Sequence, residues 1–103
     1  MLNSVSLLGR LCADPTLNKT TDGVNVTTFT IAVDRNRLNK EGKRDADFFE
    51  ITAWRQSAEF VCNNFKKGAL IAVHGNLRSH NYVDPEGNKR KVIEVVADDI
   101  SFG

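Results

Sequence analysis

The sequence DFFEITAW, residues 47–54, decides the fold that this chain can adopt. Side chains of a β-strand point alternately to its two sides, so the stretch divides into two faces. One face is apolar and suits a core: Phe49, Ile51 and Ala53. The other has an aromatic ring on either side of two polar residues: Phe48, Glu50, Thr52 and Trp54. Because a face that is polar at its middle should meet water, we expect Phe48 and Trp54 to be partly exposed, about 20 Å apart along the strand.

Two interpretations of these rings follow from the pattern. Exposed aromatic rings on a rigid sheet, with basic residues nearby, are typical of surfaces on which unpaired nucleic-acid bases stack. Alternatively, both rings cap the two ends of a barrel core and contact no ligand.

Length and composition indicate one small globular domain. The chain has 103 residues, enough for a single core over residues 1–103, with 41% hydrophobic and 26% charged residues. No apolar run approaches the roughly 20 residues of a membrane span, so we expect no membrane association. The first residues, MLNSVS, lack the charged start and long apolar stretch of a signal peptide. The sequence therefore predicts a cytoplasmic protein.

The cysteines predict neither a disulfide framework nor a metal site. Cys12 and Cys62 lie far apart, in no metal-binding or redox spacing, and are expected to be reduced packing residues. We expect no cofactor.

Basic residues are concentrated in two places although the net charge is only +1. Between positions 35 and 44 there are five of them against one acid, Glu41: Arg35, Arg37, Lys40, Lys43 and Arg44. A second group is Lys89, Arg90 and Lys91. Each group alone suits a solvated loop, but two groups beside exposed rings favour a nucleic-acid surface.

Alternating patterns predict the strands of the first half. The first strand covers about residues 2–11, and Gly9 marks a bend or bulge within it. The second covers about residues 24–34, where a change of parity near Thr27 and Thr28 predicts a bulge. Residues 35–46 are expected to form a long polar loop before the third strand, residues 47–54.

The second half begins with the only predicted helix. Ala58, Val61, Cys62 and Phe65 lie on one helical face, and Gly68 is expected to cap the C-terminus. Residues 69–83 alternate as a long fourth strand whose polar face ends at Tyr82. The sequence DPEG, residues 84–87, predicts a type I turn into a last strand of about residues 92–102.

These elements predict an all-β protein. Five strands, one short helix between the third and fourth, and a projecting hairpin between the fourth and fifth fit a five-stranded Greek-key barrel, the OB-fold. Because that fold binds oligonucleotides, proteins and sugars, it does not by itself give the function.

Six segments in one order carry a resemblance to a known family. They are NSVSLLGRL (3–11) followed by Asp14 and Pro15, FTIAV (29–33), ADFF (46–49), FKKG (65–68), GNLR (75–78) and EVVADDISF (94–102). On these segments the chain resembles the bacterial single-stranded DNA-binding proteins (SSB) over essentially its whole length. The resemblance implies sequence-independent binding and protection of single-stranded DNA in replication, recombination and repair, by homotetramers that are not enzymes.

The resemblance also implies which residues contact DNA. The stacking aromatics fall on Phe48, Trp54 and Tyr82, and a further ring of some family members falls at Arg37. Basic contacts carry over to Lys40, Lys43, Lys67 and Arg78. The neighbouring basic residues Arg35, Arg55 and Lys89 complete the predicted DNA-binding set.

One feature of the family is missing. Family members commonly continue into a flexible tail whose acidic tip recruits partner proteins, whereas this chain stops at Gly103. It is expected to be either a shortened chain or a naturally tail-less phage, plasmid or secondary bacterial form, and recruitment of partner proteins is therefore doubtful.

Two rival functions remain open from the residues alone. A protein–protein OB module, such as a primosome component, would use the same barrel. An enzyme would need site chemistry, but His74 and His80 are six positions apart with no third metal ligand, and adjacent strand residues Asp98 and Asp99 are expected to face opposite sides. RNA binding also remains open, because no residue obviously senses the 2′-hydroxyl.

Overall fold

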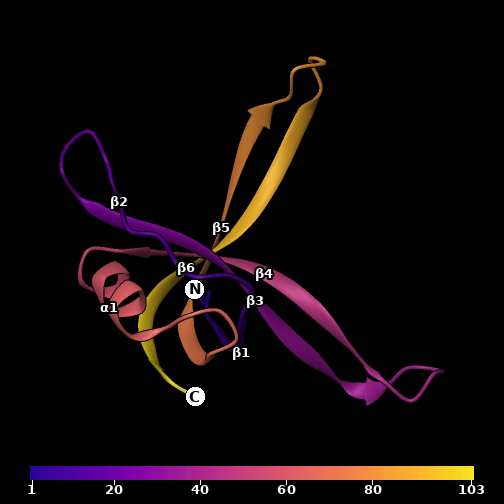
Figure 1. Ribbon diagram of the computed structural model, residues 1–103. Coiled ribbons are helices and arrows are strands. Elements are labelled where there is room, and N and C mark those ends of the chain that lie inside the picture. Colours follow the sequence, from indigo (N-terminus) through magenta and orange to yellow (C-terminus); the bar gives the residue numbers. More distant parts are fainter.

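The computed structural model describes all 103 residues and contains six strands and one helix (Figure 1). In chain order they are β1 (Val5–Leu11), β2 (Asn18–Lys19), β3 (Asn25–Leu38), β4 (Arg44–Trp54), α1 (Gln56–Asn64), β5 (Leu70–Val83) and β6 (Lys89–Phe102). The five long strands and the helix are those that the sequence predicts. The two-residue β2 is an addition that pairs with the start of β3.

The strands close into a barrel. Their order in the sheet is β1-β5-β6-β4-β3-β2, and an additional pairing of β1 with β3 joins the two sides. All pairs are antiparallel except β4 with β6, which are parallel. This is the predicted five-stranded Greek-key OB-fold barrel, with α1 in contact with β3, β4 and β6.

Thirteen buried hydrophobic residues form the core in one cluster. The predicted apolar face of β4 supplies two of them, since Ile51 and Ala53 are fully buried, while Phe49 is half-buried and packs against the cluster. α1 adds Ala58 and Val61, as its apolar spacing predicts.

The expected bulge near Thr27 and Thr28 is wrong. β3 pairs with β4 without interruption from Val26–Trp54 to Asp34–Ala46, and the irregularity lies between Asp34 and Leu38. Thr27 itself is fully buried, which keeps the parity constant along the strand. It can be buried because its hydroxyl donates a hydrogen bond of 2.9 Å to the Thr16 carbonyl.

The long loop expected over residues 35–46 is also wrong, because β3 and β4 continue outward as a hairpin. Its tip is organised by Asn39, whose Oδ1 accepts the backbone N–H groups of Glu41 and Lys43, each at 2.9 Å. Arg44 donates through Nη1 to the carbonyls of Arg35 and Asn36 at 3.1 Å. These bonds satisfy backbone groups where the strand pairing is irregular.

Gly68 does not cap the helix. α1 ends at Asn64, and Phe65 after it has extended backbone angles. Gly68 lies further on, in the turn toward β5, with a φ of 87° and a backbone N–H that donates to the Leu11 carbonyl at 2.8 Å. At nine residues, α1 is too short to cross a membrane.

The β5–β6 hairpin projects from the barrel as predicted (Figure 1). The Gly87 N–H donates to the Asp84 carbonyl at 3.0 Å, in agreement with the predicted type I turn. Near the barrel, the register of β5 against β6 shifts between His74 and Gly75. The shift leaves Asp98 and Asp99 both exposed, so the expected alternation of these two side chains is wrong.

Two glycines lie where backbones approach each other closely. A Cβ on Gly9, in β1, would lie 2.6 Å from the Ala32 carbonyl oxygen of β3. A Cβ on Gly75 would overlap with the Val96 carbonyl oxygen at the register shift. Both positions therefore exclude any side chain.

We predict that Gly75→Ala lowers the free energy of unfolding by about 1–3 kcal/mol or more, because β6 must move to admit the methyl group. Urea denaturation followed by circular dichroism measures the change. Ser79→Ala, at an exposed position of the same strand, is the control and should leave the midpoint nearly unchanged. Equal midpoints for Gly75→Ala and the wild type would contradict the prediction.

Candidate nucleic-acid interface

Four neighbouring strands, in the order β3-β4-β6-β5, share one outward face. Thr28 pairs with Thr52, Thr52 with Val96, and Val96 with Asn76, so these positions lie in one row across the four strands. Residues two positions along each strand lie on the same side. We call this surface the outer face.

The three predicted stacking residues all belong to the outer face or to its continuation along the β5–β6 hairpin. Phe48 is 67% exposed, Trp54 42% and Tyr82 48%. Phe48 pairs with the small Ala32 and Trp54 with Val26, so no large neighbour covers either ring from β3. The sequence prediction of exposed rings is confirmed.

The middle of the outer face is less uniformly exposed to solvent than the sequence predicts. Thr52 is only 6% exposed, and its hydroxyl donates to the Glu94 Oε2 at 3.1 Å. Glu50, two residues earlier, is exposed. The floor between Phe48 and Trp54 therefore carries carboxylate oxygens.

The β3–β4 hairpin holds four of the predicted basic residues. Arg35 forms a bidentate pair with Asp47, at 2.8 Å from Nη2 to Oδ1 and 3.2 Å from Nε to Oδ2. The hydrogen bond from Arg35 lowers the pKa of the Asp47 carboxyl group below its ordinary value. Arg35 is thus already neutralised by a partner.

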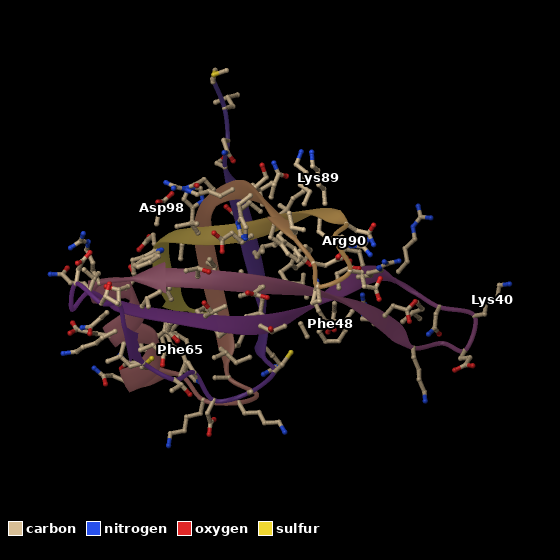
Figure 2. The ribbon with its side chains drawn as sticks, turned by 90° about the horizontal axis from the view of Figure 1, so that it is seen from above. Lys40, Phe48, Phe65, Lys89, Arg90 and Asp98 are labelled. Atoms are coloured by element: carbon tan, nitrogen blue, oxygen red, sulfur yellow. The ribbon has the colours of Figure 1, made fainter.

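The other three have no side-chain hydrogen bond or ion pair. They are Arg37, Lys40 and Lys43, all exposed. Figure 2 shows Lys40 at the far tip of the hairpin, pointing away from the barrel. These cations are free to meet phosphates.

The β5–β6 hairpin carries the second basic group. Arg78 is exposed and pairs across the strands with Glu94, while Lys89 pairs with Val83 on the side opposite Tyr82. Arg90, across from Tyr82, donates to the Asp84 Oδ2 at 3.0 Å. A cavity of about 390 Å³ lies here, lined by Asn81, Tyr82, Val83, Lys89, Arg90 and Lys91.

Asp84 fixes the shape of this hairpin tip. Its Oδ1 accepts the backbone N–H groups of Asn88 at 2.8 Å and Glu86 at 3.1 Å. The bond from Asn88, followed by that from Arg90, lowers the pKa of this carboxyl group below its ordinary value. Arg90 was not in the predicted set. Its position could have been predicted from the sequence, because pairing the residues outward from the turn places Arg90 opposite Tyr82.

Two predicted residues lie outside both the outer face and the two hairpins. Arg55 follows Trp54 at the start of α1, with a φ of 57° that is unusual for a residue with a side chain. Lys67 lies in the turn between α1 and β5, where its backbone N–H donates to the Asp14 Oδ1 at 2.7 Å. The structure does not bring Lys67 together with the three rings.

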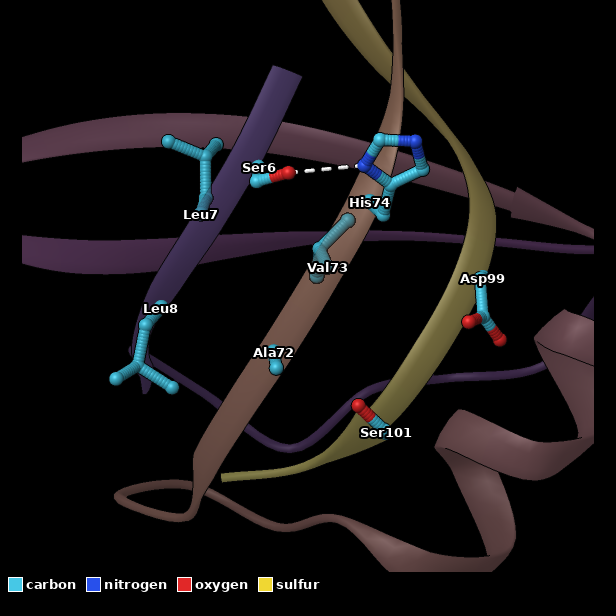
Figure 3. Close-up of a pocket in the computed structure, with 8 residues that line it drawn as sticks. All are labelled: Ser6, Leu7, Leu8, Ala72, Val73, His74, Asp99 and Ser101. Atoms are coloured by element: carbon cyan, nitrogen blue, oxygen red, sulfur yellow. Dashed lines mark hydrogen bonds between the residues drawn. The ribbon is translucent and has the colours of Figure 1, made fainter. Parts of the chain in front are cut away.

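A separate cavity of about 350 Å³ lies over β1, β5 and the end of β6 (Figure 3). It is lined by Ser6, Leu7, Leu8, Ala72, Val73, His74, Asp99 and Ser101. The Ser6 hydroxyl and the His74 Nδ1 are 2.9 Å apart. His80 lies on the hairpin instead, and no three His, Cys, Asp or Glu side chains gather as metal ligands would.

Comparisons with known proteins agree with this geometry. Residues 2–103 match the family model of the single-strand binding protein family. The chain is 50% identical over 102 residues to the single-stranded DNA-binding protein of Caldanaerobacter subterraneus subsp. tengcongensis, covering 99% of this chain and 68% of the relative. It is 46% identical to the single-stranded DNA-binding protein of Bacillus cereus, covering 99% of this chain and 60% of the relative.

A third relative, single-stranded DNA-binding protein A of Bacillus subtilis, is 46% identical over 102 residues, which are 99% of this chain and 59% of the relative. The chain thus spans 59 to 68% of the length of these three proteins. Both the family model and the relatives cover the outer face and its three rings. The chain belongs to the single-strand binding protein family.

Proposed function

We propose that the chain binds and protects single-stranded DNA without regard to sequence, as one domain that covers residues 1–103. The observation that carries this proposal is the outer face with its continuation along the β5–β6 hairpin, on which Phe48, Trp54 and Tyr82 are exposed beside the basic residues of two hairpins. The names of the relatives support the same function.

Stacking explains why the binding does not depend on the base sequence. Every base has a flat face, and each aromatic–base stack contributes roughly 1–3 kcal/mol. Duplex DNA hides those faces inside the helix, so it should bind poorly. One OB domain of this kind covers about 4–16 nucleotides.

Contacts between basic side chains and phosphates supply the salt-dependent part of the affinity. Arg37, Lys40 and Lys43 on one hairpin and Arg78 and Lys89 on the other have no side-chain partner to give up when they bind. Arg35 differs, because a phosphate must compete with Asp47 for its guanidinium. We assign Arg35, Arg55 and Lys67 to the margin of the site.

We further propose that this non-catalytic binding serves replication, recombination and repair in the cytoplasm of a bacterium. Its relatives are bacterial, and single-stranded DNA arises transiently in all three processes. The outer face protects such a strand because its bases are held against rings instead of facing solvent.

The same proposal includes assembly into a homotetramer. β1 pairs with β3 only at Arg10 and Leu11, so the opposite edge of residues 5–8 has no partner strand. Leu8 is 53% exposed on this strand, beside the cavity in Figure 3. An open strand edge and an exposed leucine are features by which a second copy can be held.

The function is tested by titrating the protein with oligo(dT) and following Trp54 fluorescence. We predict strong quenching, because a base stacks on the indole. Phe48→Ala and Tyr82→Ala should each weaken binding by roughly 1–3 kcal/mol, which is about 5- to 150-fold. Circular dichroism should show an intact fold for both variants.

Leu17→Ala is the matched control, since Leu17 is 41% exposed but lies in the loop before β2. It should leave the affinity unchanged. No binding of the wild type at low salt would overturn the proposal in favour of a protein–protein module. Loss of the fold in the ring variants would show that the rings serve stability.

For the phosphate contacts, we predict that Arg78→Gln lowers the slope of log affinity against log salt by about 0.7, the value for one phosphate contact with a single strand. Arg10→Gln removes the same charge from β1, where the guanidinium donates to the Gly68 carbonyl at 3.0 Å. That control should leave the slope unchanged. An unchanged slope in Arg78→Gln would remove Arg78 from the site.

For the assembly, we predict that the chain sediments at four times its mass of 11.5 kDa. Leu8→Glu should reduce that mass, because the new charge would be buried between copies. Leu17→Glu adds the same charge elsewhere and should not. A wild-type chain that sediments as a monomer would contradict the proposal.

A further inference from the structure

An unpaired carboxylate lies between the two rings of β4. Glu50 is two residues from Phe48 and four from Trp54, on the outer face, and its side chain is exposed. The ion pairs of the chain are Arg35–Asp47 and Arg90–Asp84, and Glu50 takes part in neither. Its side chain also accepts no hydrogen bond, and its partner across β3 is the neutral Thr30.

Its neighbours on β6 do not neutralise it. The parallel pairing of Ile51 with Val95 and Thr52 with Val96 places Glu94 beside Glu50. The Oε2 of Glu94 already accepts the Thr52 hydroxyl at 3.1 Å. Arg78 lies across from Glu94 on the far side, one strand further from Glu50. Glu50 is therefore a free acceptor on the floor of the proposed site.

The position of Glu50 determines which part of a DNA strand it can meet. When bases stack on Phe48 and Trp54, base edges lie over the floor between the rings, while the phosphates follow the basic hairpins. A carboxylate repels phosphate but accepts hydrogen bonds from amino groups. Cytosine, adenine and guanine carry an exocyclic amino group with two N–H donors, whereas thymine has carbonyl oxygens and a single ring N–H.

We propose that Glu50 is a specificity-determining residue of the DNA site, which favours bases that carry an exocyclic amino group over thymine. This inference rests on the proposed function. It adds a bias at one base position to a binding mode that is otherwise independent of sequence. Glu94 supports the bias because its negative charge lies beside Glu50. It is not a second free carboxylate, since its Oε2 already accepts the Thr52 hydroxyl.

The test compares oligo(dC) with oligo(dT) of equal length at neutral pH, because the two pyrimidines have rings of similar size. The quantity measured is the ratio of their dissociation constants. In Glu50→Gln, the affinity for oligo(dC) relative to oligo(dT) should fall roughly three- to tenfold, as expected when one charge-assisted hydrogen bond is replaced by a neutral one. Overall affinity should rise for both strands, since a negative charge is lost.

Glu41→Gln is the matched control, because Glu41 is exposed at the tip of the β3–β4 hairpin. It should raise both affinities and leave their ratio unchanged. A ratio that changes equally in both variants, or in neither, would overturn the inference.

An oligonucleotide of 2-pyrimidinone, which is cytosine without its amino group, gives an independent readout. The wild type should bind it more weakly than oligo(dC), and the difference should be smaller in Glu50→Gln, whose amide oxygen is a weaker acceptor than a carboxylate. Equal binding of both by the wild type would overturn the inference while the proposed function stands. Failure of the wild type to bind any of the three strands would instead overturn the proposed function.

Discussion

The structure depends on the attachment of β4 along both of its edges. β4 pairs with β3 over nine consecutive residue pairs, from Val26–Trp54 to Asp34–Ala46, and with β6 at Ile51 and Thr52. Ile51 and Ala53 fix the inner side of the strand in the core. The outer side is consequently rigid before any ligand arrives. Rings held on such a strand lose little conformational freedom on binding, which favours affinity.

Charge is arranged around this platform by pairing some cations and leaving others free. Asp47 binds Arg35 near the base of the β3–β4 hairpin, and Asp84 binds Arg90 at the tip of the β5–β6 hairpin. Because the pKa of each carboxyl group is lowered, both acids keep their charge, and so their bonds, at the ordinary pKa of an aspartate, and lose them only as the pH falls through the lowered value. The hairpins are thereby shaped by paired charges and present unpaired ones, so a net charge of +1 is compatible with a basic rim.

Much of this arrangement can be predicted from the sequence, because it follows from local rules. The two faces of β4 follow from strict alternation, and the spacing of Ala58 and Val61 predicts α1. The errors occur where a distant partner decides. Thr27 is buried because the Thr16 carbonyl accepts its hydroxyl. β3 extends past Asp34 where Arg44 satisfies the carbonyls of Arg35 and Asn36. The exposure of both Asp98 and Asp99 depends on the register of β5 against β6, and a single strand does not encode that register.

The site joins two requirements that oppose each other in a folded protein. In the proposed function Phe48, Trp54 and Tyr82 must stay exposed to stack with bases, yet exposed rings favour burial in a collapsed chain. The polar floor resolves the conflict for the two rings of β4. Glu50 and the Thr52–Glu94 pair make the surface between them costly to bury without hydrogen bonds, which disfavours the packing of another strand or of the helix there. In the proposed function, the residues that keep the rings open are thus the same residues that would meet the edges of the bases.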